Sequence, residues 1–339
     1  VSTFHCPSSK MSVARPSRAS KGCGARVGAV GEGVVPVAGG VANWVDLGQA
    51  QDIYLPRVQW TQDPNLLSYQ WQSRDQHHLE LRSVELPSGT TKVLLKEQSS
   101  TWLNLNDDLH FLKDKQHFVW ASERDGYKHL YLYKLDGTLV RQLTKGDWIV
   151  NKIEAINEEQ GIIYFSGRKD TPLESHLYSV PVKGGDSKRL TQAEFSHAVV
   201  MAETGQSFID SYSSVLQPTK VELKSVEGKV LTVLESNDVS GSHPLAQYKD
   251  NLVKPRFGTI KAKDGQTLYY RVFEPATLEK GKKYPKTDKI ALLSQVLDVP
   301  YDNMVSLKLD KNLAPLGEIL KSKILKEIPL DLFGIQEAD

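Results

Sequence analysis

Cysteine is nearly absent from this 339-residue chain, which has only Cys6 and Cys23, both close to its start. Disulfides therefore cannot hold the main body of the fold together, and no cysteine cluster suggests a zinc site. No apolar run approaches the eighteen residues that indicate a membrane-spanning helix. The formal net charge is only +1, so composition gives no electrostatic case for a nucleic acid or an anionic membrane as a partner.

Acidic residues are absent from residues 1–32 until the last of them, Glu32, and this segment is rich in Ser, Arg, Gly and Ala. Its apolar stretch "VGAVGEGVVPVAGG", from Val27, is interrupted by glycines and by Glu32, so it predicts no signal peptide and leaves the compartment unassigned. An Arg- and Ser-rich start is also typical of a transit peptide, which stays an alternative to a stray extension. We expect residues 1–32 to form a disordered N-terminal extension.

A repeated pattern occupies residues 33–244, namely an alternating apolar run, a glycine-containing turn and a second apolar run. Successive turn glycines are 49, 48, 47 and 44 residues apart, and they are Gly40, Gly89, Gly137, Gly184 and Gly228. A period in the forties with strand-type alternation is typical of propeller blades, each a four-stranded antiparallel sheet. Two-residue hairpins need residues of positive φ, which Asp136-Gly137, Gly184-Gly185 and Glu227-Gly228 would supply.

Each repeat also has a more continuously apolar strand, such as "HFVWA" from His117 and "GIIYF" from Gly161. Such strands are typical of sheets buried on both faces, here between neighbouring blades. The sequence therefore predicts an all-β fold, an incomplete propeller of about four to five blades. A helical solenoid would need a 3.6-residue periodicity, which this region lacks.

The rest of the chain breaks the period. Residues 245–285 indicate a linker and one hairpin around Lys263-Asp264-Gly265, without a following blade to pair with. Over residues 286–339, "DKIALLSQVLDV" and "APLGEILKSKILKEI" place apolar residues at i, i+3 and i+4. This spacing predicts two short amphipathic helices in a C-terminal tail, with Asp288 and Asn312 as candidate caps.

Several motifs together resemble one family. "QDIYLPRVQW" from Gln51, "ASERDGYKHLYLY" from Ala121, "LTKGDWIVNKIEAI" from Leu143 and "GSHPL" from Gly241 are similar to the propeller of the dipeptidyl peptidase IV family. These are prolyl oligopeptidase-like serine peptidases. The resemblance covers about residues 33–285 and ends near an apparent passage into an α/β-hydrolase domain. It implies removal of N-terminal dipeptides, from peptides with Pro or Ala second, by an enzyme whose eight-bladed propeller caps the active site.

The catalytic motifs of that family are missing from the printed residues. No G-x-S-x-G nucleophile elbow occurs, the nearest string being "GQSFI" from Gly205, and no histidine follows His243. Attack on an amide needs a nucleophile, a base and an oxyanion donor, so we assign no catalytic, cofactor-binding or metal-binding residue and expect no cofactor. The resulting hypothesis is a truncated family member that carries only the substrate-gating propeller and is inactive alone.

Three alternatives stay open beside this hypothesis. The chain could be a non-catalytic propeller that binds or scaffolds other molecules. It could complete its ring with another chain, and its exposed blade edges predict possible self-association. An interrupted or frameshifted gene would also account for the abrupt loss of the family pattern after Pro285.

Other candidate sites carry weaker signals. In the family the substrate-lining loop corresponds to "TWLNLND", where Leu105 and Asn106 stand in place of Arg and Phe, and Glu158-Glu159 could substitute for its amine-binding Glu pair. We expect Glu158-Glu159 to face water in a turn. His77-His78, His110 with His117, and Asp107-Asp108 are weak candidates for metal ligands. We expect five tryptophans to pack between blades, namely Trp60, Trp71, Trp102, Trp120 and Trp148. His129 and His176 occupy equivalent positions of the repeat, which predicts a structural role.

Overall fold

Two compact units make up the chain in the computed structural model. The first comprises Val1–Tyr212 with Lys220–Glu235, and the second comprises Ser213–Thr219 with Ser236–Asp339. Within these units the structure describes residues 2–5, 11–15, 33–36, 41, 43–48, 52–86, 88–251, 253–273 and 291–294. In this part of the chain, no helix has the length and apolar character to cross a membrane.

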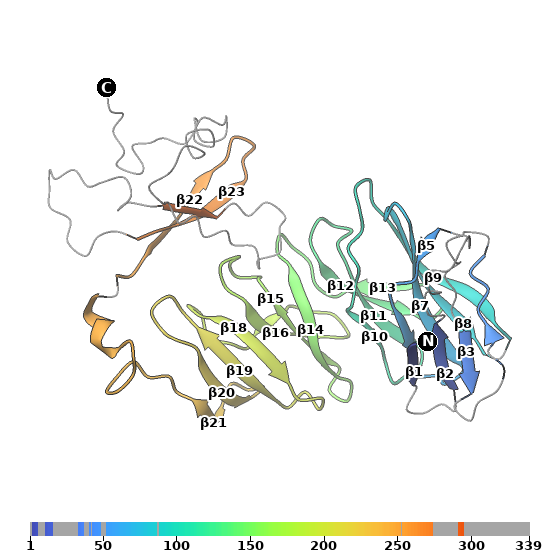
Figure 1. The fold of residues 1–339 in the computed structure, drawn as a ribbon, viewed down its shortest axis with the longest axis horizontal. Coiled ribbons are helices and arrows are strands. Elements are labelled where there is room, and N and C mark those ends of the chain that lie inside the picture. Colours follow the sequence, from blue (N-terminus) through green and yellow to red (C-terminus); the bar gives the residue numbers. More distant parts are fainter. Residues whose placement is uncertain are drawn as a thin grey trace, which may run out of the picture. The chain divides into compact units, whose positions relative to one another are not determined.

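Five antiparallel sheets form the described part of the first unit (Figure 1), and we number them I to V in chain order. Sheet I contains β1 (Ser2–His5), β2 (Met11–Arg15), β3 (Gly33–Pro36) and β4 (Asn43–Trp44). Sheet II contains β5 (Ile53–Tyr54), β6 (Val58–Trp60), β7 (Leu66–Ser73), β8 (His78–Glu85) and β9 (Thr90–Gln98). Sheet III contains β10 (Leu109–Phe111), β11 (His117–Ser122), β12 (His129–Lys134) and β13 (Leu139–Gln142). Sheet IV contains β14 (Val150–Asn157), β15 (Ile162–Gly167), β16 (His176–Pro181) and β17 (Lys188–Arg189). Sheet V contains β18 (Ser196–Met201), β19 (Ser207–Ser213), β20 (Lys220–Ser225) and β21 (Val230–Glu235).

Sheets I, III, IV and V are meanders, because their neighbouring strands follow one another along the chain. Sheets I, III, IV and V have four strands each, whereas in sheet II both β5 and β6 pair with β7. A series of four-stranded meanders is the architecture of propeller blades. The prediction of an all-β, incomplete propeller is confirmed.

The hairpin glycines lie where the sequence period places them. Gly89, Gly137, Gly184 and Gly228 have φ angles of 75°, 95°, 89° and 90°, in the left-handed region that other residues rarely adopt. Gly137 has a second reason to be glycine, because a Cβ there would lie 2.3 Å from the carbonyl oxygen of Leu94 in the neighbouring sheet II. The fifth hairpin glycine, Gly40, lies outside the described residues.

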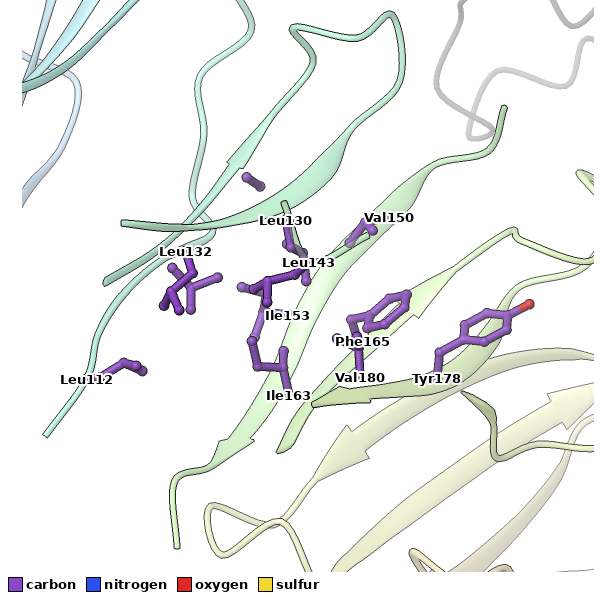
Figure 2. Close-up of a cluster of buried hydrophobic side chains, with 12 residues drawn as sticks. Leu112, Leu130, Leu132, Leu143, Val150, Ile153, Ile163, Phe165, Tyr178 and Val180 are labelled. Carbon is purple, nitrogen blue, oxygen red and sulfur yellow. The ribbon is translucent and has the colours of Figure 1, made fainter. Parts of the chain in front are cut away.

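Apolar clusters lie between successive sheets and make up the core. Figure 2 shows the cluster between sheets III and IV, where Leu130, Leu132 and Leu143 meet Ile153 and Phe165. Equivalent clusters join sheets I and II, II and III, and IV and V. The second strand of sheets III and IV is buried at five of its six positions, as expected for strands covered on both faces. The predicted inter-blade packing is therefore confirmed.

The described part of the second unit contains a short 3₁₀ helix and one small sheet. The 3₁₀ helix η1 (Ala246–Asn251) precedes sheet VI, which contains β22 (Arg256–Lys261), β23 (Thr267–Val272) and β24 (Ala291–Ser294). The β22–β23 hairpin is the predicted one, and Gly265 turns it with a φ of 87°. A Cβ at Gly258 would lie 2.3 Å from the ring of Tyr270, so this glycine makes room for a buried aromatic ring.

Two expectations differ from the structure at the chain's ends. Residues 1–32 were expected to be disordered, but β1 and β2 pair with each other, and β2 pairs with β3. The first predicted helix includes Ala291–Ser294, which instead forms β24 and pairs with β23, so the hairpin is not an orphan. Short apolar runs do not distinguish a strand from a helix, because they span too few residues for a period. The second predicted helix lies outside the described residues.

Candidate functional site

A loop of residues 99–108 joins β9 of sheet II to β10 of sheet III, and it contains the positions for which the family resemblance implies substrate contact. Asn106 fixes the loop from inside. Its side-chain amide donates to the carbonyl of Ala121, its Oδ1 accepts from the Asp108 amide at 2.9 Å, and its carbonyl accepts from Gln70 Nε2 at 2.7 Å. Asn106 is buried, so it positions the backbone and does not face a ligand.

Leu103 holds the same loop against sheet II. Its amide donates to the Gln76 carbonyl at 2.8 Å, and its carbonyl accepts from Gln72 Nε2 at 3.1 Å. Its side chain packs on the cluster between sheets II and III. Because both neighbouring sheets bind this loop through hydrogen bonds, its exposed side chains project from a fixed backbone.

Two exposed apolar side chains distinguish this loop. Trp102 is 64% exposed and Leu105 is 44% exposed. Asn104 Nδ2 donates to Glu123 Oε2 at 2.9 Å and so joins the loop to the neighbouring 123–128 loop, where Tyr127 is 38% exposed. We call Trp102, Asn104, Leu105, Glu123 and Tyr127 the loop surface. Trp102 was expected to pack between blades and does not, because it belongs to the connecting loop and not to a strand.

The other predicted tryptophans lie within the blades. Trp120 is fully buried and its indole nitrogen donates to Glu97 Oε1 at 3.0 Å. Trp148 packs against the cluster between sheets III and IV, while Trp60 and Trp71 pack against the cluster between sheets I and II. The packing prediction is therefore confirmed for these four.

Asp107 and Asp108 are candidate metal ligands by sequence, but each pairs with a cationic side chain. Arg57 Nε donates to Asp107, and this bond lowers the pKa of the carboxyl more than partial burial raises it. Lys128 Nζ donates to Asp108 Oδ2 at 2.5 Å, and the Ile153 amide donates to Asp108 Oδ1 at 2.9 Å. Asp108 is thus buried, and its hydrogen bonds join sheets III and IV.

Glu158 likewise has a structural partner. Its Oε2 accepts a hydrogen bond of 2.7 Å from the backbone amide of Lys113, which joins the β14–β15 turn to the β10–β11 turn of the preceding sheet. Glu159 is exposed in the same turn. The expectation that this pair lies in a turn is met, but Glu158 is a tie between blades and not a free carboxylate facing water.

The remaining histidine candidates do not form ligand sets. His77 Nδ1 lies 3.8 Å from Asp75 Oδ2 in an exposed turn, and His78 begins β8. His110 lies opposite Val119, whereas His117 lies opposite Lys134 and binds Asp114 Oδ2 at 2.6 Å. Burial lowers the pKa of His110. Among the residues that the structure describes, no three His, Cys, Asp or Glu side chains gather as a metal site would require.

His129 and His176 make the same contact in successive blades, as their equivalent positions predicted. His129 Nδ1 lies 3.1 Å from Thr144 Oγ1, which also accepts from the Leu130 amide. His176 Nδ1 lies 3.0 Å from Thr191 Oγ1, which accepts from the next amide in the same manner. Both imidazoles are buried, and each fastens the start of the third strand to the end of the fourth. Their role is structural.

Sheet V contains a buried charged cluster that was not anticipated. His197 Nδ1 binds Asp210 Oδ1 at 2.8 Å, and Lys224 Nζ binds Asp210 Oδ2 at 2.8 Å and Glu222 Oε2 at 3.0 Å. His197 and Asp210 have no exposed side-chain surface. A signal was present in the sequence, because Asp210 alternates with Phe208 and Tyr212 in β19 and so shares their buried face.

Lys224 forms ion pairs with both Asp210 and Glu222, and these pairs stabilise the cluster. Burial lowers the pKa of Lys224, but its interactions with Asp210 and Glu222 raise that pKa by more than burial lowers it, so the net shift is upward. Burial raises the pKa of Glu222, yet hydrogen bonds from Lys220 and Lys224 leave it below its usual value. Lys224 Nζ also lies 4.4 Å from the centroid of the Tyr212 ring. The charged forms of Lys224 and Glu222 are therefore favoured in the folded state.

The buried imidazoles of His129, His176 and His197 have structural hydrogen-bond partners. In the described part of the chain, the buried imidazoles bind threonine, carboxylate and backbone carbonyl oxygens. A general base needs a nucleophile within hydrogen-bond reach, and these three imidazoles already have other partners. The loop surface is the place where a tied backbone presents exposed side chains.

These features together define the class, a serial array of propeller blades with inter-blade ties and exposed connecting loops. Residues 24–219, more than half of the chain, match the family model described as the dipeptidyl peptidase IV (DPP IV) N-terminal region. The chain belongs to this family, which confirms the resemblance seen in its motifs.

Several proteins are similar to the chain. Dipeptidyl peptidase 8 of Mus musculus is 26% identical over 329 residues, covering 74% of this chain and 35% of the relative. Dipeptidyl peptidase 4 of Trichophyton rubrum is 30% identical over 248 residues, covering 69% and 31%. The crystal structure of Porphyromonas gingivalis dipeptidyl peptidase 4 matches with a TM-score of 0.66 and 24% identity, over 76% of this chain and 36% of that one. The chain spans about a third of the length of these relatives.

Proposed function

We propose that these blades are part of the substrate-admitting propeller of a serine-type dipeptidyl peptidase, and that the 339-residue polypeptide does not hydrolyse peptides by itself. Support comes from the relatives, which are dipeptidyl peptidases by name and whose matched part is about a third of their length. The observation that carries the proposal is the combination of family-type blades with a printed sequence that has no G-x-S-x-G elbow. The role of the propeller is to line the path by which a peptide reaches the active site. Cleavage requires groups that these residues do not supply.

An activity assay tests this proposal directly. The purified chain is incubated with Gly-Pro- and Ala-Pro-type chromogenic dipeptides, beside a dipeptidyl peptidase with an intact catalytic serine. We expect no turnover above that of a heat-treated sample. Turnover that a serine-directed covalent inhibitor abolishes would overturn the proposal, because such turnover requires an activated nucleophile in this polypeptide.

A second candidate function is non-catalytic binding of peptides, and the loop surface favours it. Exposed aromatic side chains on a tied backbone bind at a lower entropic cost than side chains on a flexible loop. The peptide class would be that of the family, with a free amino terminus and Pro or Ala second. The carboxylate of Glu123, which already binds Asn104, gives this surface a negative group suited to an amino terminus.

Isothermal titration with an unlabelled Gly-Pro-containing tetrapeptide tests this second function. We expect weak binding that Trp102→Ala reduces by about fivefold or more, as removal of an exposed aromatic contact at a small interface would. Trp44→Ala is the matched control, since Trp44 is 58% exposed but lies in sheet I, far along the chain from the loop surface. Binding that both substitutions reduce equally, or no binding, would contradict a role for the loop surface.

A further inference from the structure

Two buried imidazoles meet at the junction between sheets IV and V. His176 begins β16, His197 is the second residue of β18, and their ring centroids are 5.3 Å apart. Neither side chain has exposed surface. The backbones are joined at the same place, because the His197 amide donates to the Ser175 carbonyl at 2.8 Å. In sheet III the equivalent imidazole, that of His129, instead meets the Trp148 ring edge-on, with centroids 5.0 Å apart.

The hydrogen-bond partners of His197 call for a hydrogen on both of its ring nitrogens. Nδ1 lies 2.8 Å from Asp210 Oδ1, and Nε2 lies 2.9 Å from the carbonyl oxygen of Gln192. A carbonyl and an ionised carboxylate only accept hydrogen bonds, so both nitrogens donate and the ring is an imidazolium. Asp210 is its counter-ion and also binds Lys224. Lys224 pairs with Glu222 in turn, so two cations face two anions within the cluster.

The partners of His176 are satisfied by a neutral ring. Nε2 lies 2.9 Å from Glu174 Oε2 and donates to this carboxylate. Nδ1 lies 3.0 Å from Thr191 Oγ1, which already accepts from the Leu177 amide, so the threonine hydroxyl can donate its own hydrogen to Nδ1. One ring hydrogen, on Nε2, therefore fills both contacts of His176, whereas His197 needs two.

The surroundings of His176 oppose a proton on its second nitrogen. Burial lowers the pKa of His176, and the charges of His197 on β18 and Arg189 on β17 lower it further. Glu174 raises this pKa, but by less, so the net shift is downward. A junction that opens returns the ring to water, where a histidine pKa is about 6.5. The open state therefore binds the proton more readily, and its population rises as the pH falls below about 6.5.

We propose that the His176–His197 pair is an acid-sensitive switch between sheets IV and V. At neutral pH the pair holds one charge, on His197, and His176 is neutral beside it. A proton on His176 puts a second positive charge in a ring whose centroid is 5.3 Å from the first, with both rings out of water. The junction then opens, because hydration of both rings relieves the repulsion. In sheet III the equivalent ring meets Trp148, which adds no second charge, so opening is confined to the contact between sheets IV and V.

Hydrogen exchange of the full 339-residue chain tests this proposal, once rates are corrected for the intrinsic effect of pH on amide exchange. The protection of residues 190–201 should fall by about tenfold from pH 7.5 to 5.5, as expected for an opening coupled to one proton. Amides of β11, which lies inside sheet III, should keep their protection. Protection of residues 190–201 that does not change with pH would overturn the proposal. An equal loss in β11 would do the same, because it would mean global unfolding.

Two matched variants separate the switch from a general effect of histidine. Glutamine keeps a hydrogen-bonding side chain but takes up no proton in this pH range. His176→Gln should abolish the pH-dependent loss of protection at residues 190–201. His129→Gln alters the equivalent histidine–threonine contact in sheet III and should leave that loss unchanged. The same pH dependence in both variants would contradict a switch at His176.

Imidazole nitrogen NMR gives a second readout that a merely structural role of the two rings would not move. Two-bond proton–nitrogen spectra distinguish a ring with one hydrogen from a ring with two. At pH 7.5 we expect hydrogens on both nitrogens of His197 and on Nε2 alone of His176. A neutral His197 at this pH would overturn the proposal. Two charged rings in a junction that stays protected at pH 5.5 would overturn it as well.

Discussion

Sheets III and IV contact each other through apolar side chains, whereas sheet V also buries charged side chains. Between sheets III and IV the contact is apolar, with Phe165, Tyr178 and their neighbours buried together. In sheet V the face turned toward sheet IV combines Phe208 with the buried charges of Asp210 and Lys224. Apolar packing tolerates changes of shape that conserve volume, whereas buried charges are stable only while every partner is present. Equivalent positions in the repeat therefore have different vulnerabilities.

The largest effect is expected from removing an aromatic ring in the apolar contact. Phe165 is fully buried, and its ring centroid is 5.5 Å from that of Tyr178 and 6.0 Å from that of Trp148. Phe165→Ala should lower the free energy of unfolding by about 4 kcal/mol, through lost burial and the cavity it leaves. Urea unfolding followed by fluorescence measures this. Phe257→Ala, at a ring 45% exposed, should change stability by about 0.5 kcal/mol or less, and equal losses would refute the assignment.

A somewhat smaller effect is expected in the charged cluster. Asp210→Asn removes the anion that binds both His197 and Lys224, which leaves two buried donors poorly compensated. We expect a loss of about 3 kcal/mol, as is usual when one partner of a buried ion pair is removed. Lys224→Met in the Asp210→Asn background should recover part of that loss in a double-mutant cycle. Asp186→Asn, at an exposed carboxylate, is the control.

The smallest effect is expected in the pH dependence of the free energy of unfolding. Burial and the neighbouring His197 lower the pKa of His176, although Glu174 opposes this. The unfolded chain therefore binds the proton more readily, so stability is complete above the ordinary histidine value of about 6.5 and falls as the pH drops below it. The urea midpoint should decrease from pH 7.5 to 5.5, and His176→Gln should flatten this slope. His78→Gln, on the exposed start of β8, should leave the slope unchanged, and a slope equally steep in both variants would contradict a role for His176.

Much of this fold follows from the sequence because the repeat itself is a physical constraint. A glycine at each outer hairpin, a 44- to 49-residue period and continuously apolar second strands such as Ile162–Gly167 together predict stacked four-stranded sheets. The equivalent positions of His129 and His176 likewise predicted a structural role, which the threonine contacts explain. Periodicity works here because neighbouring blades bury the second strand of each sheet in a similar way, as β11 and β15 show.

Other features could not be predicted, because they depend on contacts between residues distant in the sequence. Asp108 looks like a loop carboxylate until Ile153 and Lys128, from other elements, are seen to bind it. Trp102 shares its residue type with buried tryptophans, and only its place in a connecting loop leaves it exposed. The boundaries proposed at residues 32, 244 and 285 remain predictions. At Ala291–Ser294 a short apolar run was compatible with two structures, and pairing with β23 determined which one forms.

The histidine–threonine fastenings have an evolutionary consequence. Each joins the third and fourth strands of a single sheet, so sheets III and IV each contain both partners of this contact. A gene encoding such units can gain, lose or exchange one of them without disrupting the internal bonds of the rest.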